Sequence, residues 1–482
     1  MRFIEIILLL IVTVFPIYIS TKNYSLNKKS ALVFIGIVFL IHLIFEGFRW
    51  QMIPSYLLIL ILTWCIFKEY SFFKGGLFRK IITGIGFAIL IIFAWVLPYI
   101  LPVFDLPTPS GKYKVGAQDV HLITDEEETI TSEAGDKREL MVKVWYPAKI
   151  NNEEKEVYLN EAERVGFASK YGLPNSIFNY LDHIETHTFI KPELAEGKFP
   201  VLIFSHGHQS NATGYYAILE EIVSHGYIVL NINHTYESVG SLFPEGEIKL
   251  YSKEFEKVQM TEEMAAMTWS ATQELEKAKT NEEEYAAVKD LIRDYVAGDI
   301  GLRWSNDISM VIDALEKGDT FSFFAKHINT SKIGVFGHSQ GATAAGQALL
   351  DDKRIKAGIS IDGILWGSMI DTTLTKPFAI LSADWDYNAY QPDLNKHIFR
   401  NGTANDFYQA KILNAGHSNF MDIPYKIRIP VINEAGSIKP EKASKITSVV
   451  VLQFFDKYLM DKNVDLMTLK KEYSELELIK VN

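Results

Sequence analysis

The stretch KIGVFGHSQGATAAG, from Lys332 to Gly346, contains the pattern Gly-x-Ser-x-Gly with Ser339 at its centre. A short apolar run typical of a β-strand precedes the pattern, and a run of small residues suited to the first turns of a helix follows it. A sharp turn between a strand and a helix exposes a serine hydroxyl, and this context gives the pattern its chemical meaning. The sequence therefore presents Ser339 as a candidate nucleophile.

A serine hydroxyl is a weak nucleophile at neutral pH, so Ser339 needs an imidazole to take its proton and a carboxylate to orient that imidazole. Asp362 directly follows an apolar strand-like run, and His417 lies further along in the segment NAGHSNF. The order Ser, Asp, His is the one in which hydrolases of the α/β class carry such a triad. Asp384 and Asp386 follow another strand-like run and are the alternative acids.

Side chains two residues before and after Ser339 would collide across so tight a turn, which explains Gly337 and Gly341. The transition state of acyl transfer places negative charge on the former carbonyl oxygen, and two backbone N–H groups usually stabilise that charge. We expect one of them from Gln340, directly after the serine, and the other from His208 in the segment FSHGHQS.

Several histidines near these motifs allow other interpretations. His206 and His208 occupy positions i and i+2, so on an extended chain both side chains would point to one side and could ligate a metal. A third ligand is not apparent nearby, and we expect neither a metal nor another cofactor. His338 is interpreted as a packing residue because its side chain must point away from that of Ser339. His234 suits either the lining of a pocket or a structural hydrogen bond.

The elements that must position these residues indicate an α/β fold. Apolar runs of strand length, most of them separated by segments with helical period, imply a mainly parallel sheet covered on both faces. The runs are ELMVKVWYPA, which should end at Pro147, FPVLIFSHGHQSN, YIVLNINHTY, KIGVFGHS, AGISIDG and KPFAILSAD. We expect a linker at 102–116 and a catalytic domain at 117–482. Its long segment 237–319 favours helices and should build a helical cap beside the site.

The first hundred residues differ sharply from the rest. Residues 1–101 carry nine Lys and Arg against three Asp and Glu, which leaves −17 for the remainder of a chain whose total charge is −11. About 20 apolar residues span a bilayer, so the first, second and fourth apolar stretches qualify and the third is marginal. We expect about four transmembrane helices over 1–101 rather than a cleaved signal peptide. The stretches are Phe3 to Ile19, Ala31 to Phe48, Ile53 to Phe67 and Ile81 to Leu101.

The loops between these stretches indicate an orientation. Basic residues gather after the first and third stretches, and the positive-inside rule places those loops in the cytoplasm and everything after residue 101 outside. Cys65, the single cysteine, lies inside the anchor, so the polar part of the chain has no thiol for a disulfide, a zinc site or a nucleophile. The acidic balance argues against a nucleic-acid partner.

Four segments carry a resemblance to a known family: FPVLIFSHGHQSNATGYYAILEEIVSHGYIVLNINH, KIGVFGHSQGATAA, AGISIDG and NAGHSNF. Over roughly residues 110 to 460 the chain resembles the plasma-type platelet-activating factor acetylhydrolases and the bacterial α/β-hydrolases grouped with them. The resemblance implies an α/β-hydrolase fold and a serine esterase whose acid follows the strand after the nucleophile. It therefore supports Asp362 over Asp384, His417 as the base, and Gln340 and His208 as amide donors.

Members of this family remove short acyl groups from phospholipids or cleave other small esters and polyesters. The family often has Gly-His-Ser-x-Gly-Gly, whereas here Ala342 follows Gly341, and THTF at Thr186 to Phe189 matches a further family feature. We expect a serine esterase anchored in a bacterial cell membrane, with its catalytic domain outside and a small ester or lipid as substrate. The alternatives are a cell-envelope acyltransferase on the same fold and an inactive hydrolase-like domain on a membrane signalling or transport protein. The sequence does not indicate an oligomeric state.

Overall fold

The structure is a computed structural model, and it describes residues 1–20, 27–69, 76–259, 261–384 and 393–481. The chain folds into two compact units, each built from segments that are distant in the sequence. The first comprises Met1–Asp105, Asn175–Ile184 and Pro424–Asn433, and the second comprises Leu106–Pro174, Glu185–Ile423 and Glu434–Asn482.

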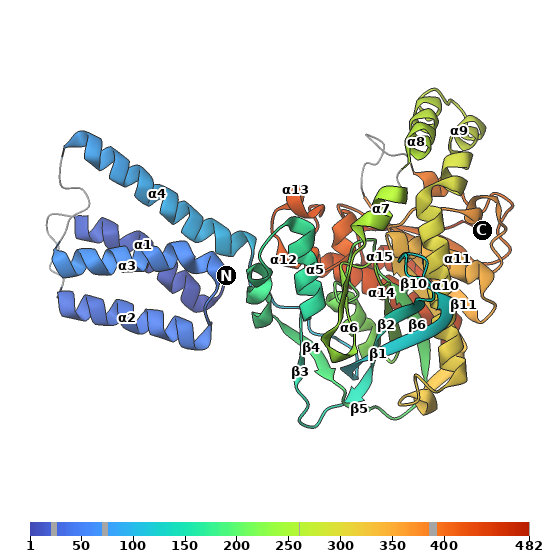
Figure 1. Ribbon diagram of the computed structural model, residues 1–482, viewed down its shortest axis with the longest axis horizontal. Helices are drawn as coiled ribbons and strands as arrows, with labels where there is room; N and C mark the ends of the chain where they lie inside the picture. The colour runs from blue at the N-terminus through green and yellow to red at the C-terminus, as the bar shows by residue number, and fades with distance from the viewer. Residues whose placement is uncertain (21–26, 70–75, 260, 385–392, 482) are drawn as a thin grey trace. The chain divides into compact units, whose positions relative to one another are not determined.

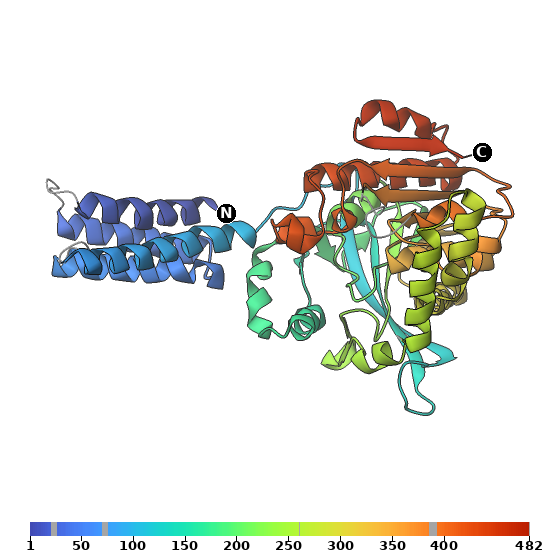
Figure 2. The same ribbon diagram turned by 90° about the horizontal axis from the view of Figure 1, so that it is seen from above.

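Four helices that lie side by side form most of the first unit (Figure 1 and Figure 2). They are α1 (Phe3–Ser20), α2 (Lys28–Phe45), α3 (Ile53–Lys68) and α4 (Leu77–Ile100), with the 3-10 turn η1 (Trp50–Met52) before α3. Leu8, Ile35 and Leu58 are buried between the helices, whereas Ile44 and Leu60 are exposed on the outside. A bundle that is apolar on its outer surface as well as inside is suited to a lipid environment.

Three segments of this bundle are long and apolar enough to cross a membrane by length and composition, namely Lys28–Phe45, Trp50–Lys68 and Leu77–Ile100. The apolar helix Phe3–Tyr18 is shorter. The third stretch, which is marginal in the sequence, qualifies because η1 extends it. The structure thus supports three spans where the sequence suggests about four.

Ionisable side chains are buried within the bundle and bind one another. Arg49 Nε lies 2.7 Å from Glu5 Oε1. His42 Nδ1 lies 3.0 Å from Glu46 Oε2, and that oxygen also accepts the backbone N–H of Glu5 at 3.0 Å. Buried charges are tolerated when they are paired, so these contacts explain how an apolar bundle holds four ionisable groups.

A mixed sheet forms the centre of the second unit. Among the described residues it has 12 strands, in the order β14, β13, β12, β11, β10, β6, β7, β2, β1, β4, β3, with β5 paired to β2. The six strands from β13 to β7 are parallel. The bounds are β1 (Lys114–Glu127), β2 (Lys137–Lys149), β3 (Lys155–Val157), β4 (Glu185–Ile190), β5 (Glu193–Leu194), β6 (Phe199–Ser205), β7 (Ile228–Asn233), β10 (Ile328–His338), β11 (Ile355–Ile361), β12 (Phe378–Ala383), β13 (Phe407–Ile412) and β14 (Leu476–Lys480).

Helices cover both faces of this sheet. On one face α6 (Tyr216–Ser224) packs beside α14 (Pro440–Leu459), and on the other α10 (Val296–Lys317) packs beside α11 (Gln340–Asp351). Side chains alternate between the faces: Ile203 belongs to the same buried cluster as Trp304 of α10, whereas the ring of Phe336 packs against that of Phe455 of α14. Strands buried on both faces must be apolar throughout, which is why their sequences read as continuous runs.

The apolar runs of the sequence correspond to β2, β6, β7, β10, β11 and β12. The expected α/β class with a mainly parallel sheet is therefore confirmed. One boundary prediction was wrong, because β2 continues to Lys149 instead of ending at Pro147. Proline lacks a backbone N–H, but its carbonyl can still pair, and that of Pro147 accepts the N–H of Ala195 at 2.8 Å.

The segment 237–319 contains the expected helices together with a small hairpin that its composition did not indicate. The hairpin strands are β8 (Gly240–Leu242) and β9 (Ile248–Leu250), and α7 (Lys253–Gln259), α8 (Glu262–Leu275) and α9 (Asn281–Asp294) lead into α10. The side chains of Thr261 and Thr280 cap α8 and α9. Figure 1 shows α8 and α9 next to each other near one end of α10. Because α10 packs in the core, this part of the segment belongs to the helical layer that covers the sheet and does not form a separate cap.

The remaining helices of the second unit are α5 (Glu161–Tyr171) and α15 (Leu469–Glu472). Asn160 begins α5 with a capping box that includes Glu163, and Gly172 ends it with a φ of 63°. The short helices α12 (Ile423–Lys426) and α13 (Pro430–Asn433) lie at or within the Pro424–Asn433 segment of the first unit.

Candidate active site

Ser339 is the one residue that connects strand β10 to helix α11. β10 ends at His338 and α11 begins at Gln340. The backbone of Ser339 has φ 56° and ψ −120°, a combination that is strained for any residue with a side chain. Its N–H donates to the carbonyl of Ile361 at 2.9 Å, and its side chain is partly exposed between two buried neighbours. The turn therefore presents the hydroxyl at the carboxyl edge of the sheet.

The two glycines that flank Ser339 allow the chain to approach itself closely. A Cβ on Gly337 would lie 2.1 Å from the carbonyl oxygen of Gly341, and a Cβ on Gly341 would lie 2.1 Å from that of Ser205. Backbone atoms at these distances cannot move aside without displacing β6 or α11. The turn thus requires glycine at both positions.

Asp362 and His417 are hydrogen-bonded to each other. Oδ2 of Asp362 lies 2.6 Å from Nδ1 of His417, while Oδ1 accepts the N–H of Ala383 at 2.7 Å. Because a carboxylate only accepts, Nδ1 carries the proton, and Nε2 is the nitrogen suited to accept one from a hydroxyl. Burial alone would lower the pKa of His417, but the hydrogen bond and the charge of Asp362 outweigh burial and raise that pKa.

Ser339 lies beside this pair at the ends of adjacent strands. Its bond to Ile361 ties it to the residue before Asp362. The buried ring of His338 lies 4.5 Å from that of His417, measured between ring centroids, and His338 Nε2 is 3.2 Å from the carbonyl oxygen of His417. Burial lowers the pKa of His338 well below its ordinary value. His338 is therefore a neutral support for the His417 loop, consistent with a packing role.

The alternative acids are placed differently. Asp384 Oδ2 accepts the N–H of Asn414 at 2.9 Å, and the N–H of Asp384 donates to Ala415 at 2.9 Å. Asp384 thus forms hydrogen bonds with the backbone of the loop that precedes His417, whereas Asp362 binds the imidazole itself. Asp386 lies outside the described residues.

The two expected amide donors border the serine. Gln340 is the first residue of α11, where backbone N–H groups have no acceptor within the helix, and its side chain donates to the carbonyl of Ala297 at 2.7 Å. His208 follows Gly207, and a Cβ on Gly207 would lie 3.3 Å from the Cβ of Ser339. The loop after β6 therefore passes directly beside the candidate nucleophile.

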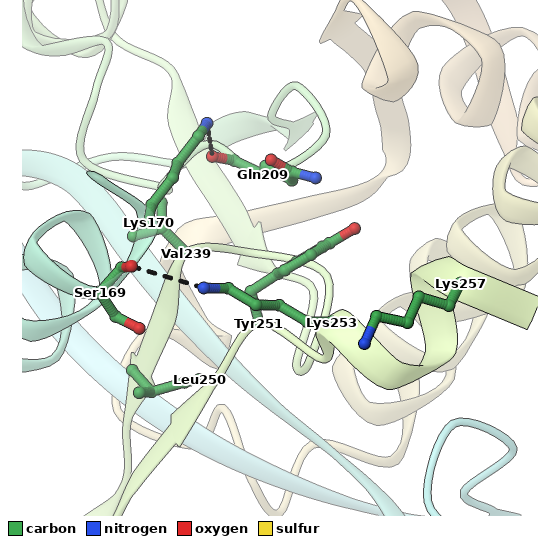
Figure 3. A pocket seen from close by; sticks show the side chains of 9 residues that line it. Ser169, Lys170, Gln209, Val239, Leu250, Tyr251, Lys253 and Lys257 are labelled. Carbon is green, nitrogen blue, oxygen red and sulfur yellow. Dashed lines mark hydrogen bonds between the residues drawn. The ribbon is translucent and has the colours of Figure 1, made fainter. Parts of the chain in front are cut away.

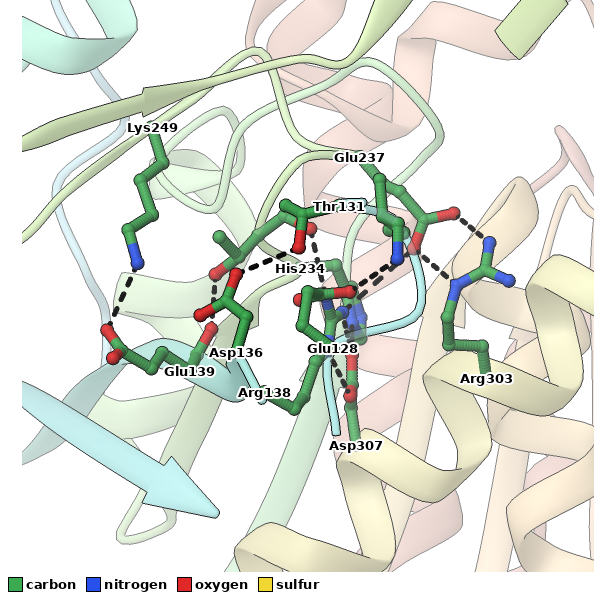
Figure 4. A network of polar contacts seen from close by, with 12 residues as sticks. Glu128, Thr131, Asp136, Arg138, Glu139, His234, Glu237, Lys249, Arg303 and Asp307 are labelled. Carbon is green, nitrogen blue, oxygen red and sulfur yellow. Dashed lines mark hydrogen bonds and ion pairs between the residues drawn. The ribbon is translucent and has the colours of Figure 1, made fainter. Parts of the chain in front are cut away.

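A second Ser-His-Asp arrangement lies inside the same unit, and Figure 4 shows its His234 and Asp307 within a network of polar contacts. Ser205 Oγ is 2.7 Å from Nε2 of His234, and Nδ1 of His234 is 2.7 Å from Oδ2 of Asp307. All three side chains are fully buried. Sequence reasoning considered a structural role for His234 but missed its partners. An aspartate among the mostly apolar residues of the buried face of α10 is the signal that could have revealed them.

The buried set differs from the pair of Asp362 and His417 because an arginine binds its aspartate. Arg138 Nη2 lies 2.6 Å from Asp307 Oδ2 and Nη1 lies 2.9 Å from Glu128 Oε2. Burial alone would raise the pKa of Asp307, but Arg138 and His234 together lower it to about 2. Burial also lowers the pKa of His234 in spite of its bond to Asp307. The network therefore holds an ionised aspartate, a charged arginine and a neutral imidazole.

The histidines considered as metal ligands have other partners. Nδ1 of the buried His206 lies 2.7 Å from the carbonyl oxygen of Gly207, and its Nε2 accepts the N–H of His234 at 3.3 Å. Burial is the main reason why the pKa of His206 falls to about 3. The ring of His208 packs edge-on against Tyr251. Across the described ranges no group of three or more His, Cys, Asp or Glu is arranged to hold a metal ion.

The parallel sheet, the strained serine turn and the Asp-His pair at the same edge define an α/β-hydrolase. A solved ferulic acid esterase from Streptomyces cinnamoneus has the same fold, with a TM-score of 0.61 at 20% identity over 79% of this chain and 100% of the other. The profile of the family described as platelet-activating factor acetylhydrolase, isoform II, matches residues 102–475, so the chain belongs to that family.

Individual relatives agree with this assignment. Platelet-activating factor acetylhydrolase of Cavia porcellus is 24% identical over 382 residues, which cover 75% of this chain and 79% of the relative. A probable 1-alkyl-2-acetylglycerophosphocholine esterase of Arthroderma benhamiae is 23% identical over 295 residues, which cover 56% of this chain and 62% of the relative. The family resemblance found in the sequence is confirmed, and the chain is a serine ester hydrolase.

Proposed function

We propose that the protein is a membrane-anchored serine esterase that hydrolyses short-chain acyl esters, with Ser339 as nucleophile, His417 as general base and Asp362 as the residue that orients it. The hydrogen bond of 2.6 Å between Asp362 and His417, beside a serine in a strained turn, is the observation that carries this proposal. The same contact raises the pKa of His417, which favours transfer of a proton to its ring.

The first half-reaction forms an acyl-enzyme. Oγ of Ser339 attacks the ester carbonyl carbon while its proton passes to Nε2 of His417. Negative charge develops on the carbonyl oxygen, where the backbone N–H groups of Gln340 and His208 stabilise it. His417 then gives the proton to the alcohol oxygen as the bond between that oxygen and the acyl carbon breaks.

The second half-reaction releases the acid. Water gives a proton to His417 and attacks the acyl carbon, and Ser339 regains its proton as the tetrahedral intermediate collapses. Asp362 remains ionised throughout and stabilises the positively charged imidazole that forms in each half-reaction. The chemistry needs no cofactor beyond these side chains.

The relatives and the apolar helices support a substrate class for this proposal. The relatives are named for the removal of acetyl groups from glycerophospholipids, and this supports a short acyl group on a small ester or a lipid. Three apolar helices support an integral anchor. The distribution of basic loops supports a catalytic unit outside a bacterial cytoplasmic membrane.

Active-site labelling tests the proposal. Full-length protein in detergent is treated with a fluorophosphonate, the adduct is located by mass spectrometry, and turnover of p-nitrophenyl esters of increasing acyl length is measured. We expect labelling at Ser339 that is lost in His417→Ala, and turnover that falls as the acyl chain lengthens. Labelling at another serine, or full turnover by Ser339→Ala, would refute the assignment of the nucleophile.

A further inference from the structure

The buried hydroxyl of Tyr215 contacts two of the segments that form the candidate active site. It accepts the backbone N–H of Gly207 at 3.0 Å and lies 3.1 Å from Nδ1 of His338. Gly207 directly precedes His208, the expected amide donor, and His338 directly precedes Ser339. Tyr215 itself belongs to neither segment, because it lies directly before α6. One side chain therefore joins the loop after β6 to the end of β10.

The partners of these groups fix the direction of each hydrogen bond. Nε2 of His338 lies 3.2 Å from the carbonyl oxygen of His417, which can only accept, so Nε2 carries the proton of this neutral ring. Nδ1 of His338 therefore accepts, and the hydroxyl of Tyr215 donates to it. Burial raises the pKa of Tyr215, so the hydroxyl keeps its proton at neutral pH. The result is a chain of hydrogen bonds from the N–H of Gly207, through Tyr215 and His338, to the backbone of His417.

The carbonyl group of Gly207 is held as well as its N–H. Its oxygen lies 2.7 Å from Nδ1 of His206, and because Nε2 of that ring accepts the N–H of His234 at 3.3 Å, Nδ1 is the donor. This carbonyl belongs to the same peptide unit as the N–H of His208, and in a planar trans peptide the two groups point in opposite directions. Fixing both polar groups of Gly207 therefore fixes the direction in which His208 presents its N–H.

Packing supports the loop after β6 unevenly. A Cβ on Gly207 would lie 3.3 Å from the Cβ of Ser339 and 3.6 Å from Oη of Tyr215, so the loop is close to its neighbours there. Two residues further on, Gln209 lines a cavity of about 500 Å³ (Figure 3). Groups beside a cavity lose packing contacts on that side. The contacts on the Tyr215 side therefore set how closely the loop approaches Ser339.

We propose that Tyr215 is a positioning residue for the reaction at Ser339. Its hydroxyl holds the loop after β6 so that the N–H of His208 faces the oxygen that becomes negative in the transition state. The proposal rests on the proposed function and adds the group that sets the geometry of its amide donor. Tyr215 acts through Gly207 and His338 rather than on the substrate. Because the donor is needed most when the oxygen carries charge, a displaced loop slows the chemical step more than it weakens ester binding.

Tyr215→Phe tests this role because it removes one oxygen atom and keeps the ring. We expect kcat for p-nitrophenyl acetate to fall by about tenfold to a hundredfold while KM changes by less than about twofold, since losing an amide donor outright costs on the order of a hundredfold or more. The matched control is Tyr216→Phe, at the next residue, which is also fully buried and donates to Oε2 of Glu156 at 3.2 Å. The control should keep kcat within about twofold. Equal losses in both variants, or full kcat in Tyr215→Phe, would overturn the positioning role and leave the esterase intact.

A transition-state analogue separates positioning from general damage to the fold. Oγ of Ser339 adds reversibly to the carbonyl carbon of benzyl trifluoromethyl ketone, its proton passes to His417, and the ketone oxygen becomes an anion where the ester oxygen would carry charge. In Tyr215→Phe we expect the inhibition constant to rise by about the factor by which kcat falls. The acid limb of the pH profile should stay in place, because Asp362 still binds His417. An unchanged inhibition constant would contradict the proposal.

Nuclear magnetic resonance tests the hydrogen bonds without turnover. In full-length protein with isotope-labelled histidine, Nδ1 of His338 should have the chemical shift of an unprotonated nitrogen at neutral pH, and its signal is assigned by its loss in His338→Gln. The signal should move in Tyr215→Phe and stay in place in Tyr216→Phe. A protonated Nδ1 would overturn the chain of hydrogen bonds. If the signal behaves as expected and the ketone binds Tyr215→Phe more weakly, but the wild-type protein hydrolyses no ester, the positioning role stands and only the proposed function fails.

Discussion

Two Asp-His pairs with a serine nearby occur in the second unit, and their hydrogen bonds between aspartate and imidazole are nearly alike. Asp362 lies 2.6 Å from His417, and Asp307 lies 2.7 Å from His234. The buried set even holds its serine, Ser205, within 2.7 Å of the imidazole. Judged by these distances alone, the buried set would pass for a catalytic triad.

Access and charge distinguish them. Ser339 sits in a strained turn and is partly exposed, whereas Ser205 ends a regular strand and is fully buried. A catalytic base must accept a proton, and the pKa of His417 is raised by Asp362, while the pKa of the buried His234 is lowered. Arg138 explains part of the difference, because it binds Asp307 and its own charge disfavours a second cation nearby. The comparison teaches that the environment of the aspartate decides what the imidazole can do.

The largest expected effect contrasts the two serines. Ser339→Ala should lower kcat for p-nitrophenyl acetate by about four orders of magnitude or more, because it removes the nucleophile. Ser205→Ala, the matched control, should lower kcat by less than about tenfold, since its hydroxyl cannot reach a substrate. Comparable losses in the two variants would show that the buried set takes part in the chemistry.

Next in size is the contrast between the aspartates. Asp362→Asn should lower kcat about a thousandfold or more, because an amide cannot stabilise the imidazolium and favours the wrong tautomer. The pH profile provides a second readout. In the wild type kcat/KM should fall with acid around the raised pKa of His417, above the ordinary value of about 6.5. In Asp362→Asn this acid limb should move to lower pH. A limb that stays in place would show that another group controls it.

Asp307→Asn should act mainly on stability. The substitution leaves Arg138 buried without its closest carboxylate, so we expect the free energy of unfolding to fall by about 3 kcal/mol, measured by urea titration of the catalytic unit's transition in the full-length protein. The pKa of Asp307 is about 2 when folded, against about 3.9 when unfolded, so its ionisation stabilises the fold above about pH 4 and this stabilisation is lost as pH falls toward 2. The variant should lack that part of the acid dependence.

The smallest expected effect concerns the buried hydroxyl. Ser205→Ala should lower the free energy of unfolding by about 1 kcal/mol, because the alanine leaves Nε2 of His234 without its hydrogen-bond donor. Fluorophosphonate labelling at Ser339 should remain complete in this variant. Loss of labelling with unchanged stability would contradict a purely structural role for Ser205.

Much of the candidate site could be predicted because its signals are local. The turn around Ser339 is encoded by neighbouring residues, since a strand, two glycines and a helix start must all occur within a few positions. Asp362 and His417 follow in the order that the fold requires. The apolar runs likewise predicted the central parallel strands, because strands buried on both faces cannot carry polar side chains.

Other features depended on residues that are distant in the sequence. The residue pattern left Asp362 and Asp384 as rivals, and the family resemblance favoured Asp362. The packed sheet places Asp362 against the imidazole and Asp384 against the preceding loop. The partners Ser205, His234 and Asp307 are separated by 29 and 73 positions. No local pattern specifies such contacts.

The sequence by itself determined the fold class, the family, the apolar anchor segments and the candidate nucleophile, because propensity, periodicity and turn chemistry act over short stretches of chain. The tertiary structure decided which carboxylate binds His417 and which serine beside an Asp-His pair is accessible. These are matters of burial and of charge between distant segments, and both arise only when the chain has packed.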